Sequence, residues 1–380
     1  MTDASSARTN TRQVPTLVRA LVVLVLLYLF LTGVSLLGGG FKSLGKDLVD
    51  GLFEGVSNPL GGLFVGLLAT VLVQSSSVST SVIVGLVASE VLGIDDAVPM
   101  IMGANLGTTV TNTLASLGHV RHDQEFRRAF AASTVHDFFN ILAVAVFLPI
   151  ELATGYLSST ASWITERVIG TSGASFKSPL KQAVKWPAGL VKDLLANLGA
   201  HGDVKGGLLI VIGLAFIFLA LAYITINMRL LVADRVEVAI NRTLGAGSGI
   251  VAIVLGTIVT ISVQSSSITT SVLVPLAASG VLTLENIYPV TLGANLGTTV
   301  TALLAALATG SPAAVTVAIV HTLFNISGIV AFYPLQALRR IPLRLANGLA
   351  SMAVERRSAA VAYTVGMFVV LPLVGVLVLR

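Results

Sequence analysis

This sequence of 380 residues contains no cysteine and little charge. Without cysteine, the chain can form neither disulfide bonds nor thiolate metal sites such as structural zinc. Charged residues make up 11% of the chain and hydrophobic residues 54%, whereas ordinary soluble domains carry roughly 25% charged residues. So little charge cannot cover a water-facing surface, and the composition predicts a protein of the lipid bilayer. The net charge of +5 suits loops that anchor membrane topology better than nucleic-acid binding.

Apolar runs long enough to cross a membrane occur several times along the chain. A transmembrane helix needs roughly 20 residues to cross about 30 Å of hydrocarbon. Such runs lie near residues 17–37, 129–150, 206–228, 313–334 and 359–379. The polar residues 1–16 lead into an apolar run that lacks a signal-peptide cleavage pattern, so we expect a cytoplasmic tail and a retained first helix. The predicted fold class is an all-α polytopic membrane protein.

The sequence contains two copies of one pattern, about half a chain apart. QSSSVSTS begins at Gln74 and QSSSITTS at Gln264, and GANLGTTVT recurs unchanged from Gly103 to Gly293, in both cases 190 residues later. VHDFFN and VHTLFN form a further pair later in the two copies. Because repeats decide architecture, we predict two homologous transmembrane units. Their predicted bounds are 17–150 and 206–334, with an extracellular linker at 151–205.

Basic residues in the short loops predict that the two copies have opposite orientations. Lys and Arg are enriched in cytoplasmic loops. In the two copies the arginines lie next to segments that do not correspond to each other, so equivalent segments are expected on opposite sides of the membrane. These arginines are Arg8, Arg12, Arg19, Arg121, Arg127, Arg128, Arg229, Arg235, Arg242, Arg339, Arg340 and Arg344. Inversion requires residues 59–92 and 250–280 each to enter the membrane and return, with Gln-Ser-Ser-Ser near the turn. We expect residues 335–380 to form a cytoplasmic basic segment and a final transmembrane helix.

The hydroxyl-rich runs predict a binding site for small ions. Inverted repeats with broken helices are typical of secondary transporters, which bind substrate near the membrane midplane between the repeats. Glutamine amides and serine hydroxyls both donate and accept hydrogen bonds, so they can contact an anion and a cation in one small volume. No Lys or Arg lies in either QSSS or GANLGTT segment, and a bound anion would lack a fixed cation to offset its desolvation. We therefore expect coupling to Na⁺, held by oxygen ligands, and no transition metal.

The two copies differ at one ionisable position. Asp137 follows His136, whereas Thr322 follows His321 at the equivalent place. An ionisable residue within a membrane-spanning segment is by default a functional candidate. Asp137 is therefore a candidate ligand for an extra cation in the first copy only.

Together these motifs resemble the type II sodium/phosphate cotransporter family, whose hallmark is a QSSS motif in each of two inverted repeats. The resemblance extends from about residue 40 to 375 and is densest over QSSSVSTS, GANLGTTVT, EFRRAFAASTVHDFFN, QSSSITTS and FNISGIVAFYPL. It implies import of inorganic phosphate with Na⁺ by alternating access. It also implies a multi-pass protein of the plasma membrane, or of the inner membrane in a bacterium.

The resemblance also implies which residues bind the ions. Both Gln-Ser-Ser-Ser runs would surround phosphate: Gln74, Ser75, Ser76, Ser77, Gln264, Ser265, Ser266 and Ser267. One sodium site would consist of Gln264, Thr298 and Thr301. The symmetric candidates in the first copy are Gln74, Thr108, Thr111 and Asn140. Asp137 stands where electrogenic members carry Asp and electroneutral members carry Gly, which implies three Na⁺ with each divalent phosphate. Ser133 departs from the Ala usual in electrogenic members.

Each motif also has a structural interpretation. Serine-rich runs in membrane helices often serve helix contacts, and Gly103 and Gly293 would permit close packing. His136 and His321 would be satisfied core residues, and Asp137 would be the partner of a buried donor.

Other function classes find less support in the sequence. The sequence contains neither the G-x-S-x-G motif of serine hydrolases nor the HExxH motif of metalloproteases. Gly40 to Asp47, GFKSLGKD, approaches a phosphate-binding loop but has Asp47 where Ser or Thr is required. We therefore do not expect this protein to be an enzyme. The alternative functions are transport of another small oxyanion and an ion channel. The sequence leaves the oligomeric state open.

Overall fold

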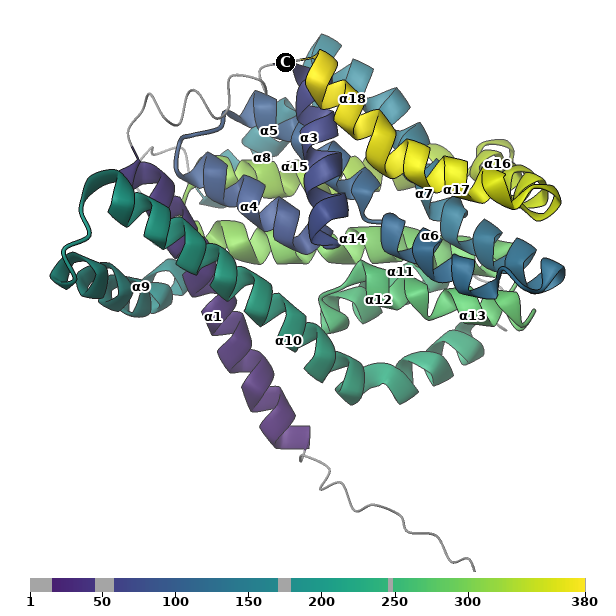
Figure 1. The fold of residues 1–380 in the computed structure, drawn as a ribbon, viewed down its shortest axis with the longest axis horizontal. Coiled ribbons are helices and arrows are strands. Elements are labelled where there is room, and N and C mark those ends of the chain that lie inside the picture. Colours follow the sequence, from purple (N-terminus) through teal and green to yellow (C-terminus); the bar gives the residue numbers. More distant parts are fainter. Residues whose placement is uncertain (1–15, 45–57, 170–178, 245–248, 380) are drawn as a thin grey trace, which may run out of the picture.

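The computed structural model describes residues 16–44, 58–169, 179–244 and 249–379, which form helices joined by short turns (Figure 1). Within these ranges no strand occurs, in agreement with the predicted all-α class. The predicted cytoplasmic tail, residues 1–16, lies outside the described residues except for Thr16.

Six helices of the described residues are long and apolar enough to cross a membrane. They are Leu17–Ser43 in α1 (Thr16–Ser43), Asp123–Thr154 (α7), Gly202–Met228 in α10 (Gly202–Leu244), Leu284–Thr309 (α14), Pro312–Phe332 (α15) and Arg357–Val378. The last span comprises α17 (Arg357–Val365), a π-helical turn (Gly366–Val370) and α18 (Leu371–Val378). Five of the six match the predicted runs. The sixth, α14, contains the second GANLGTTVT, whose polar residues interrupt the apolar run in the sequence.

Shorter helices carry the repeated motifs. In the first copy these are α3 (Pro59–Val73), α4 (Ser76–Ala88), α5 (Ile94–Gly107), α6 (Val110–Ser116) and a 3₁₀ turn, η2 (Leu117–His119). In the second copy they are α11 (Gly249–Val263), α12 (Ser266–Ser271) and α13 (Leu273–Ala278). The chain breaks after α5 within the first GANLGTT, but α14 continues unbroken through the second. Of the two GANLGTT motifs, only the first therefore interrupts a helix.

The helix pairs α3/α5 and α11/α14 cross in the same close way. A Cβ at Gly103 would overlap the carbonyl oxygen of Leu63, and a Cβ at Gly293 would overlap that of Ile253. Only glycine allows two helix backbones to approach so closely. The structure thus supports the packing interpretation of the two repeated glycines.

The predicted linker, residues 151–205, contains two helices, α8 (Tyr156–Ile169) and α9 (Pro179–Asn197). The Glu151 carboxylate accepts hydrogen bonds from the backbone N–H groups of Leu157 and Ser158, 2.5 and 3.1 Å away, and so caps α8. The hydroxyl of Thr316 on α15 lies 2.9 Å from that of Thr165. Helix α8 therefore packs against α15 as part of the folded bundle.

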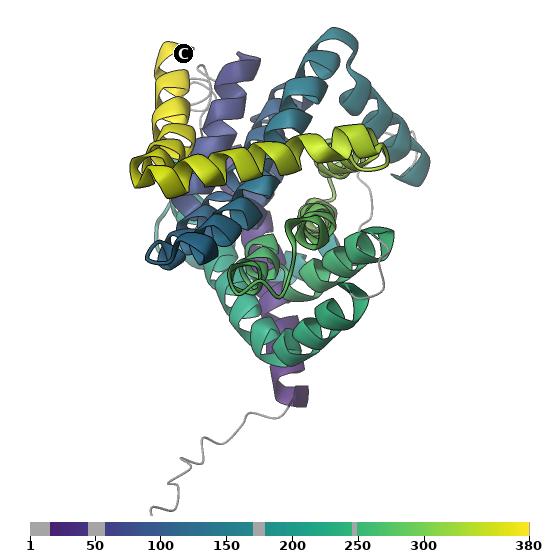
Figure 2. The same ribbon diagram turned by 90° about the vertical axis from the view of Figure 1, so that its right-hand side faces the viewer.

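The basic segment before the last span forms α16 (Gln336–Glu355), which packs along α7. Figure 2 shows α16 lying across the bundle beside the upright last span. Asp123 at the start of α7 pairs with Arg357, the first residue of α17. This contact joins the start of α7 to the start of the final span.

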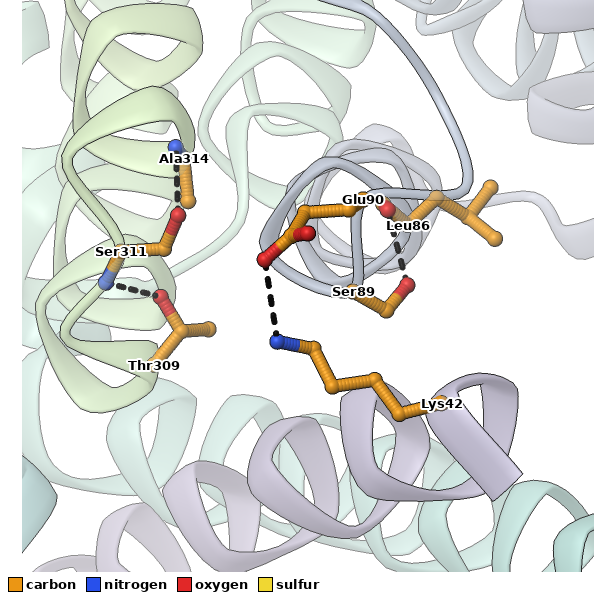
Figure 3. Close-up of polar contacts among 7 residues, drawn as sticks. All are labelled: Lys42, Leu86, Ser89, Glu90, Thr309, Ser311 and Ala314. Atoms are coloured by element: carbon orange, nitrogen blue, oxygen red, sulfur yellow. Dashed lines mark hydrogen bonds and ion pairs between the residues drawn. The ribbon is translucent and has the colours of Figure 1, made fainter.

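The end of α4 lies beside the end of α1 and near the start of α15 (Figure 3). Glu90 has a left-handed backbone, with φ of 63°, and its carboxylate lies 3.4 Å from the ammonium of Lys42. Both side chains are largely exposed, so this ion pair contributes at most about 1 kcal/mol. Ser311 caps α15 by accepting from the backbone N–H of Ala314 at 3.4 Å.

Candidate functional site

The two Gln-Ser-Ser-Ser runs have the same backbone geometry. Gln74 and Gln264 are left-handed, with φ of 58° and 56°. Each next residue caps the following helix: Ser75 accepts from the N–H of Val78 at 3.4 Å, and Ser265 from that of Ile268 at 3.3 Å. A left-handed backbone costs a non-glycine residue roughly 1–2 kcal/mol, and such strain is concentrated at functional sites.

Each glutamine of these turns is held by a threonine from a GANLGTTVT motif. The hydroxyl of Thr111 donates to Oε1 of Gln74 at 3.0 Å, and that of Thr301 donates to Oε1 of Gln264 at 2.8 Å. The glutamine Nε2 donates to its own helix in both copies, at 2.7 Å. The structure therefore brings together two of the predicted sodium-ligand pairs.

Other predicted ligands lie close to these turns. Thr108 and Thr298 donate to carbonyls of their own helices, at 3.2 and 3.1 Å. The hydroxyl of Ser267 lies 3.5 Å from the carbonyl oxygen of Thr108, which brings the second QSSS run to the end of α5. Ser76 and Ser77 are buried at the first turn of α4, and Ser266 is buried at that of α12. Within the described part of the chain, no hydrogen bond joins the two QSSS runs directly.

Helix α6 connects the two QSSS segments. Thr111 contacts the first through Gln74, and the next residue, Asn112, contacts the second. The Asn112 amide donates to the hydroxyl of Thr270 at 2.6 Å and accepts from that of Ser271 at 2.9 Å. Sequence reasoning missed Asn112, although the repeat offset offered a signal because Ala302 occupies its place in the second copy.

A buried polar network joins the two copies. Nε2 of His136 lies 2.5 Å from Oδ1 of Asn295, and Nε2 of His321 lies 3.4 Å from Oδ1 of Asn105. Each histidine thus contacts the asparagine of the other copy's GANLGTT motif. Both histidines are buried core residues, as the structural interpretation predicted, but only one ring nitrogen of each is satisfied, because neither Nδ1 has a partner among the described residues.

The predicted sodium ligand Asn140 belongs to this network. It accepts from the amides of Asn105 and Asn295 at 3.2 and 2.7 Å, and it donates to the carbonyl oxygen of Asn105 at 3.0 Å. It makes no hydrogen bond to Gln74 in the described structure, so Asn140 and Gln74 are not directly joined. A role for Asn140 in sodium binding stays a prediction.

Asp137 is fully buried beside α6 and the last span. Its Oδ2 accepts from the hydroxyl of Tyr363 at 3.0 Å and from that of Thr113 at 3.3 Å. Its Oδ1 has no hydrogen-bond partner among the described residues. A buried polar atom normally has a partner, so Asp137 stays a candidate cation ligand.

The surroundings of Asp137 have no counterpart in the second copy. Thr113 corresponds to Leu303 at the repeat offset, and Asp137 corresponds to Thr322. Sequence reasoning missed Thr113, although aligning the two copies would have shown a polar residue where the second copy has Leu303. It also missed Tyr363, which lies outside both repeats and had no sequence signal.

Comparison with known proteins shows which family this chain belongs to. A family profile described as Na⁺/Pi-cotransporter matches residues 29–159 and 217–354. Human sodium-dependent phosphate transport protein 2B is 33% identical over 444 residues, covering 93% of this chain and 64% of that protein. Rat sodium-dependent phosphate transport protein 2A is 35% identical over 427 residues, covering 94% of this chain and 67% of that protein. The chain thus spans about two thirds of these relatives' length. No solved structure shows a significant match.

Proposed function

Because the chain belongs to the Na⁺/Pi-cotransporter family, we propose that it imports inorganic phosphate together with Na⁺ by alternating access. The family match and the six apolar helices show a multi-pass membrane protein, for which we propose the plasma membrane, or the inner membrane in a bacterium. The observation that carries the proposal is the duplicated QSSS turn, with the same left-handed glutamine, serine cap and threonine contact in both copies.

The phosphate site is proposed to lie between the two QSSS turns. Each turn starts a new helix segment, where the first backbone N–H groups have no intrahelical partner. Such N–H groups favour an anion, and serine hydroxyls can donate further hydrogen bonds. Ser76 and Ser77 in the first copy, with Ser266 and Ser267 in the second, are the proposed phosphate contacts, together with Gln74, Ser75, Gln264 and Ser265.

Two symmetric sodium sites are proposed beside the phosphate. Na⁺ is a hard cation that prefers oxygen ligands, like the hard cations Ca²⁺ and Mg²⁺. Oxygen ligands are supplied at equivalent places by two hydrogen-bonded pairs, Gln74 with Thr111 and Gln264 with Thr301. Thr108 and Thr298 lie on the same motifs. With no fixed cation among these ligands, bound Na⁺ would offset the desolvation of phosphate, which couples the two ions.

A third sodium ion is proposed at Asp137. The unpartnered Oδ1 is a charged oxygen ligand in a buried place, where an unpaired charge is costly. Only the first copy has this carboxylate. Three Na⁺ with one divalent phosphate would move one net positive charge inward, so transport would be electrogenic.

We also propose that the copies have inverted topology and that the QSSS segments are re-entrant hairpins. Helices α3 and α11 each have 15 residues, which extend about 22 Å at 1.5 Å per residue. This length is less than the roughly 30 Å of the hydrocarbon core. Each QSSS turn would then end a helix inside the membrane, where irregular backbone is tolerated next to protein or a water-filled cavity.

Alternating access would move one QSSS segment relative to the other. The second segment is tied to α6 through Asn112. It is also tied within itself, because Thr260 donates to Thr269 at 2.8 Å. In the first segment the equivalent Thr70 hydroxyl has no partner among the described residues, and Gln74 is the contact with α6. This asymmetry supports a second segment that is held by more hydrogen bonds than the first, with α6 joining the two.

The test is radiolabelled phosphate uptake into proteoliposomes, with and without an inward Na⁺ gradient, at clamped interior-positive and interior-negative potentials. We expect saturable uptake that needs Na⁺ and is faster with a negative interior. Loss of the potential dependence in Asp137→Gly, with Na⁺-dependent uptake retained, would assign the net charge to Asp137. Uptake without Na⁺ dependence would refute the coupling.

The same vesicles separate the alternatives. A transporter of another oxyanion would show competition by sulfate or arsenate that is stronger than competition by unlabelled phosphate. An ion channel would carry current that does not saturate with phosphate and has no fixed ratio to it. We expect neither result, and we expect no hydrolysis of phosphate esters by the purified protein.

A further inference from the structure

We propose that Tyr363 is a positioning residue for the cation site at Asp137, an inference that rests on the proposed function. Its hydroxyl holds Oδ2 of the carboxylate, so that Oδ1 faces the cation. Through Tyr363, the last membrane span thereby contributes to the sodium site that determines the net charge transported with each phosphate.

The hydrogen bonds around Asp137 are arranged on one side of the carboxylate. Tyr363 and Thr113 both donate to Oδ2, at 3.0 and 3.3 Å, while Oδ1 has no partner among the described residues. The hydroxyl of Thr109 also lies within reach of the carboxylate, but it donates to the Leu106 carbonyl oxygen at 3.2 Å. A carboxylate has two equivalent oxygens that exchange by rotation about the terminal bond. Two donors on the same oxygen select one rotation and leave the other oxygen as the ligand.

The Tyr363 ring is fixed by aromatic neighbours on α7 and on its own helix. Its ring centroid lies 6.4 Å from that of Phe130, 6.0 Å from that of Phe138 and 6.4 Å from that of Phe368. The Phe130 and Phe368 contacts are edge-to-face, a favoured arrangement of aromatic pairs. Because the ring cannot easily turn away, its hydroxyl is a fixed donor to Asp137.

The local backbone of the last span supports a functional role for this contact. The π-helical turn Gly366–Val370 begins three residues after Tyr363. Such turns are rare interruptions of α-helices and are frequently found at functional sites. The turn changes the phase of the helix after Tyr363, so α17 can present the hydroxyl to Asp137 while Phe368 packs on the Tyr363 ring. Tyr363 lies outside both repeats, so the second copy has no equivalent donor.

The experiment compares Tyr363→Phe with wild type in the proteoliposome assay. A hydrogen bond to a charged group contributes about 1.5–3 kcal/mol, which corresponds to a change of roughly 10- to 100-fold in an equilibrium constant. We expect an apparent Na⁺ affinity at least about tenfold lower in Tyr363→Phe, with the phosphate affinity at saturating Na⁺ unchanged. Tyr288→Phe is the control, because Tyr288 is a fully buried tyrosine whose hydroxyl has no hydrogen-bond partner among the described residues.

A double-mutant comparison separates positioning from general structural damage. In the Asp137→Gly background, Tyr363→Phe should have no further effect on Na⁺ affinity, because the carboxylate that it positions is gone. The Na⁺-induced rise in melting temperature, which reports binding without transport, should be reduced by Tyr363→Phe and unaffected by Tyr288→Phe.

The outcomes distinguish this inference from the proposed function. An equal loss of Na⁺ affinity in the Asp137 and Asp137→Gly backgrounds would overturn the positioning role. So would a Tyr363→Phe variant that matches wild type while Asp137→Gly abolishes the potential dependence. Wild-type uptake that does not depend on Na⁺ would instead refute the proposed function.

Discussion

Thr111 and Asn112, neighbours on α6, hydrogen-bond to the two different QSSS segments: Thr111 to Gln74 at 3.0 Å and Asn112 to Thr270 at 2.6 Å. Successive residues of an α-helix point about 100° apart, so one short helix can contact two separate elements. Helix α6 therefore lies between two segments that are almost 200 residues apart in the sequence. A movement of either segment would be transmitted to the other through this helix.

Asn112→Ala, which introduces the residue found at the equivalent Ala302, should release the second QSSS segment from α6. Two hydrogen bonds are lost, and each typically contributes about 0.5–1.5 kcal/mol. We expect faster amide hydrogen exchange in residues 264–278 and little change in residues 76–88. Asn347→Ala is the control, because the amide of Asn347 donates to the Leu343 carbonyl oxygen of its own helix, at 3.0 Å, and not to a QSSS segment. Unchanged exchange in residues 264–278 would show that Asn112 does not hold this segment.

Gln264→Glu should weaken sodium and phosphate binding together. The substitution keeps the length of the side chain and the oxygen that accepts from Thr301, but it adds a negative charge beside the proposed phosphate. Repulsion in a region of low dielectric opposes the anion, and loss of the amide removes the bond from Nε2 to Ile261, 2.7 Å long. We expect at least about a tenfold rise in the phosphate concentration for half-maximal uptake, an effect of about 1.4 kcal/mol.

The equivalent variant in the first copy, Gln74→Glu, serves as the comparison for this prediction. If the two turns form one pocket, both variants should impair phosphate uptake, and the double variant should be impaired further. Uptake kinetics of Gln264→Glu that match those of wild type would argue strongly against a shared pocket.

Gly103→Ala should destabilise the protein through the crossing of α3 and α5. The added Cβ would overlap the carbonyl oxygen of Leu63, which is backbone and cannot turn away. The helices would have to separate, at a cost of about 1–3 kcal/mol. We expect a clear fall in the melting temperature in detergent, measured by tryptophan fluorescence or by aggregation.

Gly348→Ala is the matched control for this glycine substitution. Gly348 lies within α16, and a Cβ there would meet no atom within 4 Å. Alanine favours a helix over glycine by about 1 kcal/mol, so this variant should be slightly more stable than wild type. A Gly103→Ala variant as stable as Gly348→Ala would contradict the observed crossing.

Much of the fold and part of the site could be predicted from the sequence. The period of the repeated motifs located both QSSS turns, and the short apolar stretches before them predicted helices too short to cross a membrane. The pairs Gln74/Thr111 and Gln264/Thr301 were predicted together through the family resemblance. Helix α14 was missed as a span, because its asparagine and threonine side chains interrupt the apolar pattern although they are buried against other helices.

The sequence by itself determined the membrane class, the duplication and the lone carboxylate of the first copy, because composition and repeated motifs are visible without knowing which residues touch. Only the tertiary structure decided that Asn112 contacts the second QSSS segment, that each histidine contacts the asparagine of the other copy, and that Tyr363 contacts Asp137. These contacts join residues more than 150 positions apart. Their partners are set by how whole helices pack, since a buried polar group bonds to whichever partner the packing places within reach.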